Sequence, residues 1–258
     1  MAIEYLIHRD CPVKEALQIE KIVTRIKLRA SARAIMQHLS GEGAPEKEIR
    51  ATIFSYTLFG PGGEERRTQF TVGQALDLGD ELTALGERCA GCPIAGTEPF
   101  RCYGSISYPI SAAAEQWLCS LCTAAVEQGG TNAAVVERIP GIGLKGAAFE
   151  AMRKDAGGAY FENKEPAKVT IRKNMFTKET ITSSQLLELL FGTSPLEGRH
   201  TMLLLLLAGA DLTAVPPRPE PSLPPAPPDD EGHVGEFIQF FERLSSAFLL
   251  DTSVGVDF

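Results

Sequence analysis

Four cysteines in the first part of the chain have the spacing of a metal site. Cys89 and Cys92 form a C-x2-C pair, Cys102 follows in the same stretch, and Cys11 stands alone before a proline near the N-terminus. Tetrahedral zinc is commonly held by four thiolates, and a C-x2-C pair supplies two of them from one turn. The pattern predicts a metal site made of Cys11, Cys89, Cys92 and Cys102.

Cys11 is the favoured partner of the loop cysteines because of the residue that follows it. Pro12 directs Cys11 away from helical backbone angles and to the cap position of a helix, where a thiolate is stabilised. The alternatives for this ligand are a histidine or one of Cys119 and Cys122, which form a second C-x2-C pair. That second pair falls inside the clearest amphipathic helix, where a buried cysteine is typical of a core. A chain without bound metal is the remaining alternative.

Zinc is the favoured ion because it is common in structural four-thiolate sites. An iron–sulfur cluster is the alternative, since Cys-Pro sequences such as Cys11-Pro12 and Cys92-Pro93 also occur where thiolates hold such a cluster. A third interpretation makes Cys102 a nucleophile beside Arg101, but no histidine partner is identifiable. Whether the protein is an enzyme is left open.

A second signal lies in the segment 133–153, which contains the sequence Ile139-Pro-Gly-Ile-Gly-Leu-Lys145. This stretch resembles the helix-hairpin-helix element of DNA-binding and repair proteins. The resemblance implies that Gly141, Gly143 and Lys145 bind a backbone phosphate, because glycines permit close approach and the next helix begins with unpaired amides. A plain helix–loop–helix connection is the alternative interpretation.

Composition limits the remaining classes of function. A chain of 258 residues with 44% hydrophobic residues can bury a core without metal or disulfides. A net charge of -8 argues against a surface devoted to nucleic acid. The first ten residues lack the features of a secretory signal, and the apolar run 203–207 is far shorter than the ~20 residues of a membrane span. We therefore expect a cytoplasmic protein that does not contact a membrane.

The pattern of apolar residues predicts an α+β fold. We expect an N-terminal strand at 3–8, a helix from 13 to about 39, a β-hairpin of 49–59 with 68–72 around the turn 60–63, and a helix at 73–86 leading to the cysteine-rich metal loop. The C-terminal half is predicted to be mainly helical. Thr182 and Gln185 form a capping box before a leucine-rich helix.

These features give four predicted regions: an α+β metal-binding region at 1–130, a mainly helical region at 131–214, a Pro-rich linker at 215–232 and a C-terminal amphipathic helix at 233–258. The predicted function is that of a cytosolic metal-binding protein with a structural four-cysteine site, which binds or scaffolds a protein partner. The alternative is a nucleic-acid-associated protein or enzyme that uses the 133–153 element and carries an iron–sulfur cluster.

Overall fold

The chain forms two compact units in a computed structural model that describes residues 2–59, 65–95, 99–155, 158–172, 178–228 and 230–257. Unit 1 combines Met1–Arg9 with Cys102–Phe258, and unit 2 is Asp10–Arg101. The boundaries between the units therefore fall after Arg9 and after Arg101, whereas the sequence suggested a boundary near residue 130.

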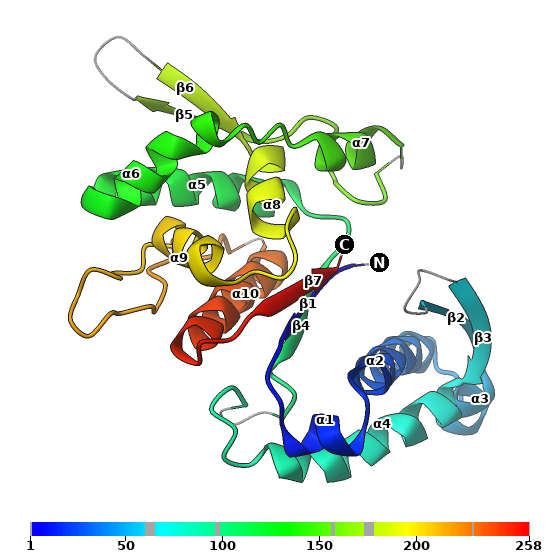
Figure 1. Cartoon of the computed structure of the whole chain (residues 1–258). Helices are drawn as coiled ribbons and strands as arrows, with labels where there is room; N and C mark the ends of the chain where they lie inside the picture. The colour runs from blue at the N-terminus through cyan, green and yellow to red at the C-terminus, as the bar shows by residue number, and fades with distance from the viewer. Residues whose placement is uncertain are drawn as a thin grey trace. The chain divides into compact units, whose positions relative to one another are not determined.

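Unit 1 contains a three-stranded antiparallel sheet in the order β4-β1-β7, formed by Tyr103–Ser107, Ala2–Ile7 and Val254–Asp257. It joins strands from the start, middle and end of the chain (Figure 1). On the middle strand, buried residues alternate with partly exposed ones, as expected for a strand with one face against a core. Tyr5 is paired with Gly104.

Helix α10 (Glu231–Leu249) packs against strands β4 and β1 of this sheet (Figure 1). Most of its apolar face is buried, although Leu249 at its end is 62% exposed. The ring of Phe240, which is 0% exposed, meets the ring of Tyr5 edge-on at a centroid distance of 5.1 Å. The predicted C-terminal amphipathic helix is therefore present, and it buries its face on its own unit.

The rest of unit 1 is mainly helical. Its further elements are α5 (Ala112–Gln128), α6 (Gly130–Arg138), the short 3-10 helix η2 (Ile139–Ile142), α7 (Ala147–Asp155), the hairpin of β5 (Lys168–Arg172) and β6 (Lys178–Thr182), α8 (Ser183–Phe191) and α9 (Gly198–Leu207). The predicted capping box of Thr182 and Gln185 opens α8 and is confirmed. Ser111 caps α5 by accepting a hydrogen bond from the Ala114 N–H.

The Pro-rich segment is held against unit 1 by hydrogen bonds along its length. The Arg218 N–H donates to the Asp211 carbonyl oxygen at 2.8 Å, and the Ser222 N–H donates to the Ala208 carbonyl oxygen at 2.9 Å. The indole Nε1–H of Trp117 donates to the Pro224 carbonyl oxygen at 3.0 Å. Residues 215–228 thus form a strap on unit 1.

Unit 2 consists of α1 (Pro12–Ala16), α2 (Ile19–Gly41), α3 (Glu46–Ala51), the hairpin of β2 (Ile53–Phe59) and β3 (Glu65–Thr71), α4 (Val72–Gly86) and the short 3-10 helix η1 (Glu87–Cys89). Helices α2 and α4 pack along each other (Figure 1). The predicted hairpin turn at 60–63 lies outside the described residues.

The single helix predicted from residue 13 to about 39 is wrong in one respect, because two extended residues divide it. Leu17 has φ -142° and ψ 124°, and Gln18 has ψ 144°. The break places Leu17 against the core cluster of Val13, Ile22 and Leu82. No glycine or proline marks this break, so tertiary packing decides it.

The predicted fold class is confirmed: the molecule is α+β, with an N-terminal strand, helices and a β-hairpin followed by a mainly helical C-terminal half. Within the described ranges, no helix is both long and apolar enough to cross a membrane.

Candidate metal centre

Cys89 and Cys92 lie at the two ends of one tight turn. The Cys92 N–H donates a hydrogen bond to the Cys89 carbonyl oxygen at 2.9 Å. Between them, Ala90 has φ -57° and ψ 128° and Gly91 has φ +78°, the angles of a type II β-turn. Such a turn needs a positive φ at its third residue, which explains the glycine. The sequence therefore folds locally into a turn that brings the two cysteines close together.

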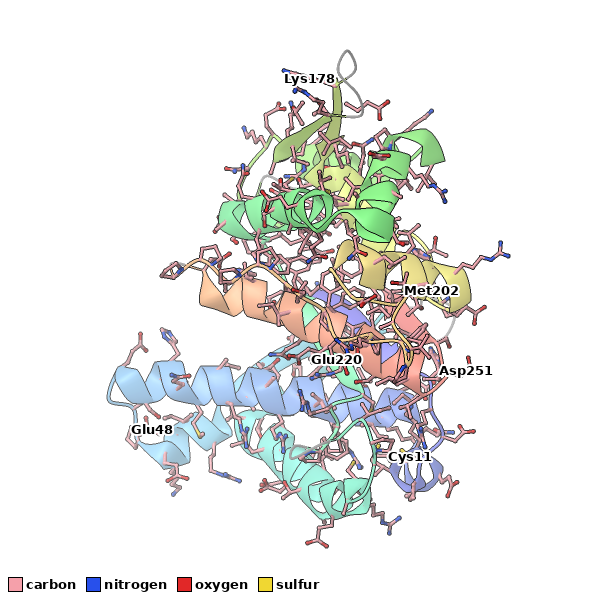
Figure 2. The ribbon with its side chains drawn as sticks, turned by 90° about the vertical axis from the view of Figure 1, so that its left-hand side faces the viewer. Cys11, Glu48, Lys178, Met202, Glu220 and Asp251 are labelled. Carbon is pink, nitrogen blue, oxygen red and sulfur yellow. The ribbon has the colours of Figure 1, made fainter. Side chains whose placement is uncertain are left out.

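Cys11 lies at the N-cap of α1, with φ -157° and ψ 159°, and Pro12 is the first helical residue (Figure 2). The predicted cap position is confirmed. Helix α1 packs against η1, the short helix that ends at Cys89. Cys11 and Cys89 are both partly buried against one apolar cluster, whose centre includes Leu82. Unit 2 thus gathers three of the four predicted ligands.

Cys102 belongs to unit 1, where its carbonyl oxygen accepts a hydrogen bond of 2.8 Å from the Ile7 N–H beside the start of β4. Its thiol is partly exposed. Among the residues that the structure describes, no group of three or more histidine, cysteine, aspartate or glutamate side chains is arranged to hold a metal. Within unit 2, Cys11, Cys89 and Cys92 are therefore not preassembled around one point.

The second C-x2-C pair has a different environment. Cys119 and Cys122 lie one turn apart on α5, 3% and 0% exposed. Burial raises the pKa of each thiol to about 12, with Glu115 adding to the effect on Cys119 and Cys119 adding to that on Cys122. A thiol that resists ionisation is a poor metal ligand, so this pair serves as core.

The predicted phosphate-binding residues lie in the connection between α6 and α7. Gly141, Gly143 and Lys145 are exposed, and no described atom outside their chain neighbours lies within 4 Å of a Cβ built on either glycine. Helix α6 packs against α5 and α9, whereas α7 packs against α8. The Gly146 N–H, at the start of α7, donates to the Glu188 carboxylate at 2.5 Å, so this amide already has an anionic partner.

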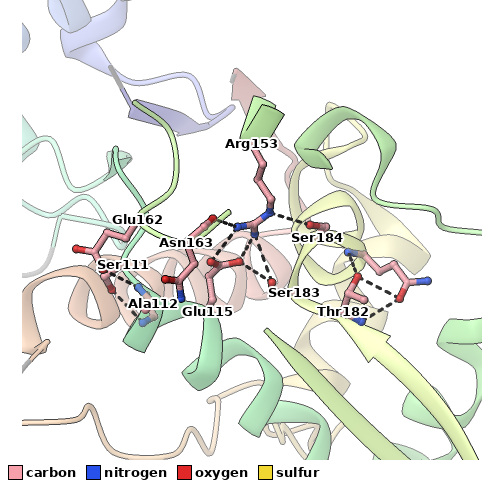
Figure 3. Close-up of polar contacts among 11 residues, drawn as sticks. Ser111, Ala112, Glu115, Arg153, Glu162, Asn163, Thr182, Ser183 and Ser184 are labelled. Carbon is pink, nitrogen blue, oxygen red and sulfur yellow. Dashed lines mark hydrogen bonds and ion pairs between the residues drawn. The ribbon is translucent and has the colours of Figure 1, made fainter. Parts of the chain in front are cut away.

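Unit 1 also contains a buried ion pair that the sequence did not indicate. Arg153 of α7 binds Glu115 of α5 through both terminal nitrogens, with Nη1 3.1 Å from one carboxylate oxygen (Figure 3). Ser183 donates to the same carboxylate at 2.5 Å, and Ser184 accepts from Arg153 Nε at 3.2 Å. Both charged side chains are almost completely buried.

Further contacts complete the surroundings of this arginine. Nη1 also donates to the Asn163 carbonyl oxygen at 2.9 Å, and the guanidinium lies 3.8 Å from the ring centre of Phe161. The N–H groups of the Arg153 guanidinium are therefore paired with groups of the chain itself. The arginine ties α5, α7, α8 and the segment at 161–163 together. No local pattern reveals the pair, because its partners are far apart in the sequence.

Comparison with known proteins gives no relative of this chain. No family model, curated protein or solved structure matches it.

Proposed function

We propose that the chain is a metal-binding protein in which Cys11, Cys89 and Cys92 hold a structural ion in unit 2. The observation that carries the proposal is the type II turn between Cys89 and Cys92, closed by the 2.9 Å hydrogen bond. A turn of this kind lets two thiolates approach one ion, which is how a C-x2-C pair contributes to zinc sites.

The position of Cys11 also supports the proposal. Its helix packs on η1, and its side chain shares an apolar cluster with Cys89, although the two residues are far apart in the sequence. An ion held here ties the start of unit 2 to the end of α4. Since the thiols do not surround one point beforehand, the ion draws its ligands together, as in sites where metal binding and folding are coupled.

The fourth ligand is predicted from the sequence alone to be Cys102. Zinc is the favoured ion, because four thiolates satisfy its tetrahedral preference. An iron–sulfur cluster uses the same donor set and is the alternative cofactor. All six cysteines, each in the described part of the chain, are outside disulfides, which fits a reducing compartment such as the cytoplasm.

A structural site with four protein ligands holds segments of a fold together and leaves no open position for a substrate, so the proposed role is binding or scaffolding of a protein partner. The experiment that tests metal binding is elemental analysis with a visible absorption spectrum of protein purified without oxygen. One zinc per chain and no colour is the expected result. Brown protein with iron and sulfide favours the cluster, and protein that contains neither metal contradicts the proposal.

A second candidate is nucleic-acid binding through residues 139–146. It is supported by the open space around Gly141 and Gly143 and by the exposure of Lys145. A phosphate contact made by a lysine is sensitive to salt. Lys145→Glu should abolish DNA binding measured at low salt, while Lys168→Glu, an exposed control on β5, should not. Absence of binding by the unaltered protein at low salt excludes this candidate.

A further inference from the structure

The chain contains two C-x2-C pairs in contrasting structural settings. One lies in a turn of unit 2 whose intervening residues are exposed, and the other lies inside a buried helix of unit 1. Spacing alone does not distinguish them, so backbone geometry and solvent access decide what each pair can do.

The turn brings Cys89 and Cys92 within reach of a disulfide. The first and last Cα atoms of a β-turn are less than about 7 Å apart, and disulfides join Cα atoms at about 4.4–6.8 Å. Ala90, Gly91 and Pro93 are exposed and both cysteines are partly exposed. Among the described residues, and apart from its two chain neighbours, no atom lies within 4 Å of a Cβ built on Gly91, so this side of the turn is open to a small reagent.

The helical pair, Cys119 and Cys122, has neither the short distance nor the exposure that a disulfide-forming pair requires. Side chains three residues apart on a helix have Cβ atoms about 5–6 Å apart, whereas a disulfide needs about 3.5–4.5 Å. Cys119 and Cys122 are also buried, and burial holds their thiols in the neutral, unreactive form. They provide a control within the same molecule.

We infer that Cys89 and Cys92 form a reversible dithiol–disulfide site, a modification that the helical pair does not undergo. The oxidant is a low-molecular-weight disulfide. One cysteine thiolate attacks it and releases the first small thiol, and the other cysteine then attacks the mixed disulfide and releases the second. One S–S bond forms in the protein, one breaks in the oxidant, and two protons and two electrons pass to the released thiols.

This inference goes beyond metal binding and does not need it. Where a metal is present, the two states exclude each other, because a sulfur in a disulfide is no longer a thiolate ligand. Oxidation of the turn would then release the ion, and bound ion would slow oxidation. The metal-free protein shows the chemistry of the turn most directly.

Differential alkylation with mass spectrometry tests the inference. The full chain is reduced, treated with a chelator, equilibrated in glutathione redox buffers, alkylated, and then reduced and alkylated with an isotopically distinct reagent. Trypsin cleaves after Arg88 and Arg101, so the peptide 89–101 contains only Cys89 and Cys92. The peptide 102–138 contains Cys102 with both helical cysteines, and 10–14 contains Cys11.

We expect the peptide 89–101 to lose both alkylatable thiols together and to carry an internal disulfide. Cys119 and Cys122 should be oxidised only after the chain is unfolded. Cys89→Ser should instead leave a glutathione adduct on Cys92, whereas Cys122→Ala should leave the turn unchanged. The inference is overturned if residues 89–101 stay reduced, carry two separate glutathione adducts, or link only to Cys11.

Metal content of the reduced protein is measured in parallel, which separates the two proposals. Formation of the internal disulfide in a chain that binds no metal supports the inference and removes the proposed function. Protein that binds metal but does not form the internal disulfide after chelation supports the proposed function and overturns the inference.

Discussion

Arg29 of α2 lies across Gly79 of α4, and its Nη1 donates a hydrogen bond of 3.4 Å to the Gly79 carbonyl oxygen. A Cβ built on Gly79 would lie 2.8 Å from the Cβ and 2.7 Å from the Cγ of Arg29. These atoms are near the arginine backbone and have little room to move. The glycine therefore permits the close packing of α2 on α4 in unit 2.

Gly79→Ala should lower the free energy of unfolding by about 1–3 kcal/mol through overpacking, although alanine is the better helix former. Gly41→Ala at the end of α2 is the matched control, since in the described part of the chain no atom outside its own helical turn lies within 4 Å of its built Cβ. Denaturant unfolding measures both variants. Adding Arg29→Ala should relieve much of the overpacking. If Gly79→Ala destabilises the unaltered protein and the Arg29→Ala variant equally, this contact is not the cause.

The turn between Cys89 and Cys92 depends on one glycine. Gly91 has φ +78°, which costs an L-residue with a Cβ roughly 1–2 kcal/mol. Gly91→Ala should therefore weaken metal binding by about tenfold, and Gly91→Asn should weaken it less because asparagine tolerates this conformation. Competition with a chromogenic chelator measures the affinity. Equal metal affinity of Gly91→Ala and the unaltered protein would refute the role of the turn.

Removing the charge of one partner in the buried Glu115–Arg153 pair should strongly destabilise the protein. Glu115→Gln leaves the arginine buried without its counter-charge, and we expect a loss of about 3–5 kcal/mol in the free energy of unfolding. Glu165→Gln, at an exposed site, is the control. The double change Glu115→Gln with Arg153→Met should be less destabilising than the sum of the two single changes. Strict additivity would show that the two side chains do not act as a pair.

The helical cysteines predict a dependence on alkaline pH. Their pKa values are raised by burial to about 12, whereas thiols in the unfolded chain have a pKa of about 8.5. Ionisation therefore favours the unfolded chain, and the free energy of unfolding should fall as pH rises from about 8.5 to about 12. Burial also raises the pKa of Tyr5 and Tyr108, which adds to the loss at the upper end of this range.

The double variant Cys119→Ala, Cys122→Ala should show a flatter alkaline profile than the unaltered protein in denaturant unfolding at several pH values. The comparison uses the slope of the free energy of unfolding against pH. The loss of stability caused by the smaller alanine side chains is the same at every pH, so it does not affect this slope. An unchanged slope would mean that these thiols do not control alkaline stability.

The Pro-rich strap should loosen when its indole contact is removed. Trp117→Phe keeps an aromatic ring beside Phe237 but removes the donor to the Pro224 carbonyl oxygen. A hydrogen bond contributes about 1 kcal/mol, so amide exchange at Ser222 should become about fivefold faster. Ser120→Ala removes a hydrogen bond within α5 and is the control. Unchanged exchange would mean that Trp117 does not hold the strap.

Local signals predicted much of this structure. The capping box of Thr182 and Gln185, the amphipathic helix that contains Cys119 and Cys122, and the N-cap position of Cys11 all follow from residues close together in the sequence. Gly91 between the cysteines likewise signals a tight turn. Such features depend on neighbours in the sequence, so periodicity and spacing are sufficient to find them.

The features that the sequence did not predict depend on contacts between segments that are distant in the sequence. Strands β4 and β7 are short and become strands only by pairing with β1. The break at Leu17 follows from packing on a cluster that includes Leu82. Nothing in the sequence around Glu115 indicates a buried ion pair, because its partner Arg153 is distant in the sequence. The assignment of Cys102 to unit 1 also required the fold.

The metal content of a set of cysteine variants tests whether Cys11, Cys89, Cys92 and Cys102 hold an ion. Protein purified without oxygen should contain one metal per chain, and Cys11→Ser, Cys89→Ser, Cys92→Ser and Cys102→Ser should each lower both the metal content and the melting temperature. Cys122→Ala should keep the metal. Unchanged metal content and melting temperature in Cys89→Ser and Cys92→Ser would show that the turn cysteines do not hold a structural ion.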